Sequence, residues 1–289
     1  MNDNSDTPKV VVGIDGSPDS RVALEWAVDP DKNLGEIRTL TAYNIGPFFD
    51  GLGMAPSAVY SPEIFREAAE ERAKSVLNQV DPTLLGSHRT VQGSAGRCLV
   101  EAAEDADLLV VGCRGRSAAA EMLLGSVGSY CVKHSNVPVA IVPETGHIRG
   151  PLSRLVVGVD GSDNGKAALR WALDHIDQYG KVVAMGTFAM MFHAFSVPEP
   201  PEPELVAQMT DVVQEAVSAV ASQKEIDQFI EIDVHAGDPR MELRIGGENS
   251  SALVVGSRGH RGVAHLLLGS TATSLAQHPT AVTIVVPDH

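Results

Sequence analysis

Short apolar runs alternate with amphipathic stretches along the whole chain. The runs VVVGI at residues 10–14 and LLVVG at 108–112 are continuous, whereas the stretch 62–80 repeats its apolar residues with the period of a helix. Strands of a parallel sheet are buried on both faces by crossover helices, so they carry continuous apolar runs of this kind. The pattern therefore favours an α/β fold with parallel strands joined by helices.

The first half of the chain predicts the order β-α-β-α-β-α-β-α-β. Its first strand, at 10–14, ends before Asp15, and Ser17 and Pro18 have the residue types of a helix cap and a first helical residue. The apolar face of this helix carries Val22, Ala23, Trp26 and Ala27. Further strands are expected at 38–43, 88–93, 107–112 and 137–142, and further helices at 61–80, 97–106 and 126–134.

The second half repeats this order because the chain contains an internal repeat. Residues 10–28 and 155–173 are identical at ten of nineteen positions without a gap. Strands are predicted at 155–159, 181–188, 229–237, 251–256 and 280–286, with helices after 162 and at 203–221, 241–247 and 271–278. We predict a disordered tail at 1–8 and two domains, 9–146 and 147–289, joined by a segment that contains Pro and Gly.

A second match between the halves falls after the fourth predicted strand. The pattern G-x2-G-x9-G-S, hereafter the glycine frame, occurs once in each half with no insertion. Its residues are Gly112, Gly115, Gly125 and Ser126 in the first half and Gly256, Gly259, Gly269 and Ser270 in the second. Ligands of doubly wound sheets bind beyond the carboxyl ends of the strands, which is where both frames fall.

The glycine frame suits an anionic ligand. Glycines at a strand exit let a loop turn tightly and let a ligand approach the main chain, and a Gly-Ser pair at a helix start offers unpaired N–H groups to a phosphate. Positive charge is available from Arg114 and Arg116 in one half and from Arg258, His260 and Arg261 in the other. The alternative is a glycine-rich turn and a capped helix that bind nothing.

Asp15 and Asp160 end the first strand of each half, and we expect both to be partly buried. Each carboxylate either caps the helix that follows or accepts hydrogen bonds from an adenine amine or ribose hydroxyls, and both roles are compatible. Other nucleotide motifs are missing: residues 161–168, GSDNGKAA, depart from a P-loop, and no G-x-G-x-x-G follows the first strand.

Composition sets limits on function. The net charge of −15, spread through both halves, disfavours binding to nucleic acid, and no apolar run is long enough to span a membrane. The start of the chain is unlike a signal sequence, and the three cysteines show no metal spacing. We therefore expect a cytoplasmic protein.

The glycine frame, together with V-G-[IV]-D-G-S and A-L-x-W-A upstream, closely resembles the universal stress protein family in its tandem-domain, ATP-binding form. The resemblance implies two doubly wound domains, each an open five-stranded parallel sheet of strand order 3-2-1-4-5 with helices on both faces. It also implies pairing along the fifth strand, either between the two halves or in a homodimer. One departure is the segment 116–122, RSAAAEM, where family members often have a further glycine and an aromatic residue.

The resemblance also implies a site for ATP in each half, with Mg²⁺ on the bound phosphates. Asp15 and Asp160 would meet adenosine, Ala42 and Thr187 would offer backbone to adenine, and the glycine frame would hold ribose and phosphates. The remaining implied site residues are neighbours of these in sequence: Gly13, Ile14, Gly158, Val159, Val127 and Thr271.

Three functions remain open at this point. The chain is expected to be a regulatory ATP-binding protein of stress response or growth control that acts through an unidentified protein partner. The alternatives are a nucleotide-free structural dimer and a slow ATPase of the adenine nucleotide alpha-hydrolase-like group. Since no general base or P-loop-like lysine can be assigned, any hydrolysis is expected to be slow.

Overall fold

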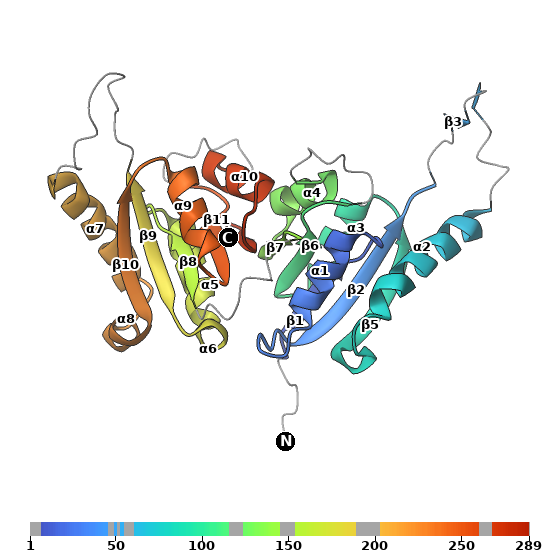
Figure 1. Ribbon diagram of the computed structural model, residues 1–289, viewed down its shortest axis with the longest axis horizontal. Coiled ribbons are helices and arrows are strands. Elements are labelled where there is room, and N and C mark those ends of the chain that lie inside the picture. The colour runs from blue at the N-terminus through green and yellow to red at the C-terminus, as the bar shows by residue number, and fades with distance from the viewer. Residues whose placement is uncertain are drawn as a thin grey trace. The chain divides into compact units, whose positions relative to one another are not determined.

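The computed structural model describes residues 7–45, 49–50, 53–54, 61–115, 124–144, 154–188, 203–259 and 268–288. Contacts divide the chain into a first unit, Met1–Val137, and a second unit, Pro138–His289. Each unit contains a sheet with helices packed against it (Figure 1). The predicted tail, residues 1–8, lies mostly outside the described residues.

The sheet of the first unit has the strand order β5-β2-β1-β6, and all its pairs are parallel. The strands are β1 (Lys9–Gly13), β2 (Glu36–Tyr43), β5 (Leu85–Gln92) and β6 (Leu108–Gly112). Strands β1 and β6 are buried over most of their length, whereas every residue of the edge strand β5 is at least partly exposed. The continuous apolar runs therefore mark buried strands, as the pattern predicts.

The described part of the first unit also contains four helices and one short turn of 3₁₀ helix. They are α1 (Pro18–Ala27), α2 (Pro62–Leu77), η2 (Pro82–Leu84), α3 (Ala95–Ala102) and α4 (Ser126–His134). Ser17 and Ser61 cap α1 and α2 as predicted, and Val22, Ala23, Trp26 and Ala27 are each no more than 2% exposed. A two-residue hairpin, β3 (Phe49–Asp50) with β4 (Gly53–Met54), was not predicted.

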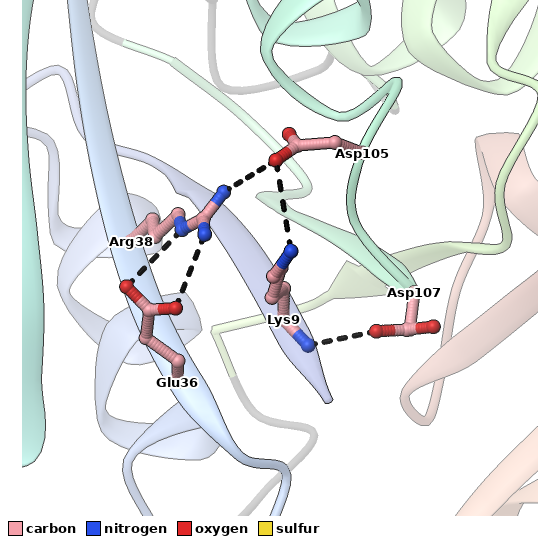
Figure 2. Close-up of polar contacts among 5 residues, drawn as sticks. All are labelled: Lys9, Glu36, Arg38, Asp105 and Asp107. Carbon is pink, nitrogen blue, oxygen red and sulfur yellow. Dashed lines mark hydrogen bonds and ion pairs between the residues drawn. The ribbon is translucent and has the colours of Figure 1, made fainter. Parts of the chain in front are cut away.

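An ion-pair network lies at the amino ends of β1 and β2, away from the carboxyl edge where the candidate sites lie (Figure 2). Asp107 accepts a hydrogen bond of 2.8 Å from the backbone N–H of Lys9, and Arg38 pairs with both Asp105, at 2.9 Å, and Glu36, at 3.1 Å. The hydrogen bond from Arg38 lowers the pKa of the Asp105 carboxyl group. Exposed pairs of this kind stabilise a fold weakly.

The sheet of the second unit has the order β10-β9-β8-β11-β12-β7. The strands are β7 (Val139–Val142), β8 (Leu155–Gly158), β9 (Val182–Phe188), β10 (Ile230–Ala236), β11 (Ala252–Gly256) and β12 (Thr283–Val286). Strands β8 to β12 are parallel and realise the order 3-2-1-4-5 for the second repeat. This strand order confirms what the resemblance implied.

The described helices of the second unit are α5 (Asp163–Asp174), α6 (Ile176–Tyr179), α7 (Pro203–Ser218), α8 (Gln223–Phe229), α9 (Pro239–Glu248) and α10 (Ser270–Gln277). Two of them, α6 and α8, were not predicted. None of the helices in the described part of the chain combines the length and apolar character that crossing a membrane requires.

Strand β7 belongs to the first sequence repeat but to the second compact unit. It pairs antiparallel with β12, so that Ala140 lies beside Ile284, and all four of its residues are buried. The predicted repeat boundary, 146/147, falls within residues outside the described part of the chain. The units divide earlier than the repeats because β7 buries its apolar side chains within the second unit.

Candidate functional site

A cavity of about 410 Å³ opens at the carboxyl ends of β1, β2 and β6 in the first unit. Ten of the eleven residues predicted for this site line it, and the eleventh, Arg116, lies outside the described residues. The ten are Gly13, Ile14, Asp15, Ala42, Gly112, Arg114, Gly115, Gly125, Ser126 and Val127. The residues that the repeat and the resemblance predicted for the first half thus lie around one cavity, apart from Arg116.

The turn after β1 fixes Asp15 at the edge of the cavity. The Ile14 N–H donates to Leu40 O at 2.9 Å, which extends the strand pairing, and Oδ1 of Asp15 accepts the Ser17 N–H at 2.9 Å. Gly16 between them has φ 86°, a left-handed conformation that favours glycine. Asp15 therefore bonds to the turn that begins α1, and it lines the cavity as well, so the two roles proposed for it are compatible.

The two glycines after β6 serve different purposes. A Cβ on Gly112 would stand 2.7 Å from the backbone oxygen of Asp19, so this glycine lets α1 pack closely on the strand exit. A Cβ on Gly115 would stand 2.9 Å from Oδ2 of Asp15 and would intrude on the side chain at the edge of the cavity. We expected both glycines to let the loop turn tightly and a ligand approach the main chain, and Gly112 in addition leaves room for the backbone of α1.

The first turn of α4 forms another wall of the cavity. The Gly125 N–H donates to Cys113 O at 2.8 Å, which ties the start of the helix to the strand exit. Gly125 is the N-cap and provides no side-chain cap, and Ser126, Val127 and Gly128 of the first turn also line the cavity. Uncapped N–H groups at a helix start favour an anionic partner.

The buried carboxylate of Asp19 binds both the backbone and the side chain of Arg114. Oδ2 of Asp19 accepts the Arg114 backbone N–H at 2.8 Å and lies 3.4 Å from its Nε, and the Asp19 side chain is only 7% exposed. Asp19 is not one of the residues that line the cavity. It therefore fixes the loop after β6 without contributing its carboxylate to the cavity wall.

Sequence reasoning missed seven lining residues: Ser20, Leu40, Ala95, Leu99, Val111, Cys113 and Gly128. Ala95 and Leu99 come from α3, which has no motif of its own, and only the crossover connection could have indicated that this helix reaches the site. Cys113 is 7% exposed, and burial raises the pKa of its thiol to about 11, so it contributes a neutral thiol at ordinary pH.

The second unit repeats the backbone contacts of the first. Val159 N–H donates to Met185 O at 2.9 Å, Gly161 has φ 83°, and the Gly269 N–H donates to Ser257 O at 2.7 Å. A Cβ on Gly256 would stand 2.6 Å from the backbone oxygen of Asn164. The glycine frames therefore have the same structural basis in both repeats.

The side chains around the second frame differ from those of the first. The pocket there, also of about 410 Å³, is lined by Gly161, Ser162, Asp163, Asn164, Arg258, Gly259 and Asp288. Only Arg258 and Gly259 were predicted for the site, and His260 lies outside the described residues. The other predicted residues do not line this pocket: Gly158, Val159, Asp160, Thr187, Gly256, Gly269, Ser270 and Thr271.

Asp160 is exposed, so the expectation of partial burial is correct for Asp15 and wrong for Asp160. Its Oδ1 accepts both the backbone N–H of Ser162, at 3.1 Å, and the Ser162 hydroxyl, at 2.5 Å. The carboxylate is turned towards its own helix cap, where solvent reaches it. A Cβ on Gly259 would still stand 2.6 Å from Oδ2 of Asp160, so the two residues are adjacent as predicted.

Arg258 forms an ion pair with a carboxylate that follows the last strand of its repeat. Asn164 stands where the first repeat has Asp19, and the Nη2 of Arg258 forms an ion pair with Oδ2 of Asp288, which follows β12. In the described part of the chain, no group of three or more His, Cys, Asp or Glu side chains is arranged to hold a metal ion.

Comparisons of the sequence and of the fold with known proteins match this chain to one family. The sequence model of the universal stress protein family matches residues 7–143 and 151–287. A universal stress protein of Mycobacterium tuberculosis strain H37Rv is 28% identical over 293 residues, covering 96% of this chain and 95% of the relative. A universal stress protein of Archaeoglobus fulgidus has the same fold, with a TM-score of 0.71, 20% identity, and coverage of 98% of this chain and 99% of that one.

Proposed function

Because the chain belongs to the universal stress protein family, we propose that it is a regulatory nucleotide-binding protein that takes up one ATP per sequence repeat. The observation that carries the proposal is the cavity of the first unit, which joins Asp15, the glycine frame and the uncapped start of α4. Its volume of about 410 Å³ lies within the range of roughly 300–1000 Å³ that small-molecule sites occupy.

The residues fit the chemistry of ATP. Apolar walls from Leu40, Leu99 and Val111 suit the adenine ring, and the half-buried Asp15 carboxylate suits ribose hydroxyls or the adenine amine. The N–H groups of the first turn of α4, together with Arg114, suit the phosphates. Since no described side-chain cluster would hold a metal, Mg²⁺ would be bound chiefly by the phosphates themselves.

In the proposed role the protein responds to ATP rather than consuming it quickly. Burial keeps the thiol of Cys113 protonated, so this side chain on the cavity wall does not act as a general base at ordinary pH. A site that binds ground state and transition state equally gives no rate enhancement. We propose that the chain acts in the cytoplasm, in stress response or growth control, through a protein partner and as a homodimer or an intramolecular pair of repeats.

The direct test is the nucleotide content and affinity of the whole chain. Freshly purified protein should release close to two ATP per chain on denaturation, and turnover should lie far below the roughly 1–1000 per second of typical enzymes. Calorimetry should show one ATP lost in Asp15→Ala and both lost in the double variant with Asp160→Ala. A folded double variant with unchanged affinity for ATP would contradict the proposal.

A matched control separates binding from turn stability. Asp15 accepts the N–H of the residue two positions later, and Asp81, outside the cavity, accepts the Thr83 N–H in the same way at 2.9 Å. Asp81→Ala should therefore lose a similar turn hydrogen bond and keep its ATP affinity. Asp15→Asn should keep the turn, because its amide oxygen still accepts, yet bind ATP more weakly than wild type.

A further inference from the structure

We propose that Asp19 is a positioning residue for ATP at the first repeat, where it holds the loop after β6 ready for the phosphates although its side chain does not line the cavity. The inference rests on the proposed function and adds a residue that acts on the site from outside it. It follows from the hydrogen bonds on the two sides of one peptide unit, between Cys113 and Arg114.

This peptide unit is bound on both sides. Its carbonyl oxygen, on Cys113, accepts the N–H of Gly125 at 2.8 Å, and its N–H, on Arg114, donates to Oδ2 of Asp19 at 2.8 Å. Gly125 is the N-cap of α4, and Asp19 lies in the first turn of α1. The peptide unit therefore joins the starts of two helices, one of which, α4, lines the cavity with its first turn.

The two hydrogen bonds also set the position of the residue that follows. A Cβ on Gly115 would lie 2.9 Å from Oδ2 of Asp15, and a Cβ on Gly125 would lie 3.6 Å from the nitrogen of Gly115. A shift of the peptide unit would therefore move Gly115 relative to both walls of the cavity. Because a ligand binds more tightly to a loop that is already in its bound conformation, we expect the hydrogen bond to Asp19 to raise the affinity for ATP.

The burial of Asp19 makes this hydrogen bond costly to lose. Its side chain is 7% exposed, and Oδ2 also lies 3.4 Å from Nε of Arg114. In Asp19→Ala the Arg114 N–H would lose a bond to a charged group in a place that water reaches poorly, and the loop would have to move to recover one. We expect ATP to bind the first repeat roughly tenfold more weakly after this change.

Electrostatics alone predicts a change of the opposite sign. A buried carboxylate beside the loop repels the phosphates of ATP, so removing its charge without moving the loop would make ATP bind more tightly. Asp19→Asn separates the two contributions, because its amide oxygen can still accept the Arg114 N–H while the charge is lost. We therefore expect Asp19→Asn to keep the affinity within about threefold of the parent chain.

The test uses the full chain with Asp160→Ala, in which the remaining ATP binding reports the first repeat. Calorimetry should show roughly tenfold weaker binding when Asp19→Ala is added and a change of no more than about threefold with Asp19→Asn. The matched control is Val22→Ala, because Val22 is buried on the same helix and does not line the cavity. This variant should lose stability in urea unfolding and keep its affinity for ATP within about twofold.

Hydrogen exchange in the wild-type chain tests the same inference without any variant that could fail to fold. The amide of Arg114 should exchange slowly both with and without ATP, because Asp19 holds it before the nucleotide binds. Rapid exchange of this amide in the absence of ATP would overturn the inference.

The outcomes separate this inference from the proposed function. ATP binding that is unchanged or tighter in a folded Asp19→Ala chain would overturn the positioning role and leave the ATP site standing. Equal losses in Asp19→Ala and Asp19→Asn would also overturn it, because the charge rather than the hydrogen bond would then be required. An equal loss of affinity in Val22→Ala would show that Asp19 acts only through the stability of α1. A wild-type chain that binds no ATP would contradict the proposed function itself.

Discussion

The turn after β1 and the turn after β8 share their backbone hydrogen bonds, whereas the side chains around them differ. Both have a left-handed glycine, Gly16 and Gly161, and both are followed by a serine-capped helix. The first nevertheless borders a cavity that α3 helps to line, and the second borders a pocket lined mainly by the start of α5. The two repeats therefore agree more closely in backbone geometry at these sites than in the charged residues and side-chain contacts around them.

Helices α3 and α9, which correspond to each other in the two repeats, also differ in their exposed residues. On α3, Arg97 and Glu101 form an ion pair of 2.7 Å. The corresponding positions of α9 carry Met241 and Ile245, which are 58% and 51% exposed. Buried positions of these helices agree in type, with Leu99 at 3% and Leu243 at 4% exposure. Packing limits the residue types on the helix face that contacts the sheet. On the face exposed to solvent, the residue types can differ between the repeats.

The largest expected effect tests whether the two strand exits are equivalent. Gly112→Val and Gly256→Val should each destabilise their own unit by about 4 kcal/mol, because the added Cβ would collide with the backbone of the neighbouring helix. Urea unfolding followed by CD would measure both. A loss below about 1 kcal/mol in one variant only would show that the helix can move in that repeat and that the exits are not equivalent.

A smaller effect should distinguish the two leucines. Leu243 packs on Gly158, and Leu243→Ala should cost about 3 kcal/mol because it leaves a closed void. Leu99 packs on Gly13 in the same way but also borders the cavity, so Leu99→Ala should cost about 2 kcal/mol and also weaken ATP binding at the first repeat. Chemical unfolding and calorimetry on both variants would measure this difference. Equal losses of stability in the two variants, with unchanged ATP binding, would show that Leu99 is not part of the ATP site.

The smallest effect concerns pH and the thiol that only the first repeat has at its site. Burial raises the Cys113 pKa from 9.0 to about 11, so the folded chain holds this proton more tightly than the unfolded chain. The resulting stabilisation is complete below pH 9 and is lost as the pH rises from 9 to 11. Cys113→Ser, which introduces the residue found at Ser257, should therefore lose less stability over this interval than wild type. Identical pH profiles from 9 to 11 would show that the thiol is not shielded as the geometry indicates.

Local signals account for the elements that the sequence predicted correctly. Ser17-Pro18 and Ser61-Pro62 are a cap followed by a first helical residue, and the predicted helix at 126–134 coincides with α4. The unpredicted α8 also had a signal, because Ser222 and Glu225 form a capping box that can be recognised from their spacing. The short α6, which ends at Gly180 with φ 75°, had no comparable cap.

The sequence by itself determined the two repeats, the parallel α/β order and the positions of both glycine frames. These depend on residue type and spacing: glycine where φ is positive or a helix approaches closely, serine at a helix start, and apolar runs in buried strands. Asp15 and its neighbours could be placed at one edge because the carboxyl ends of parallel strands meet there.

Only the tertiary structure decided which charges meet at each frame and what closes the space beside it. Asp19 and Arg114 are 95 positions apart, and Arg258 and Asp288 are 30 apart, so no local pattern could reveal either pair. The contribution of Ala95 and Leu99 to the first cavity likewise depends on how α3 crosses the sheet. Contacts of this kind depend on how segments distant in sequence pack against one another. A sequence repeat does not specify these contacts when corresponding side chains differ, as Asp19 and Asn164 do.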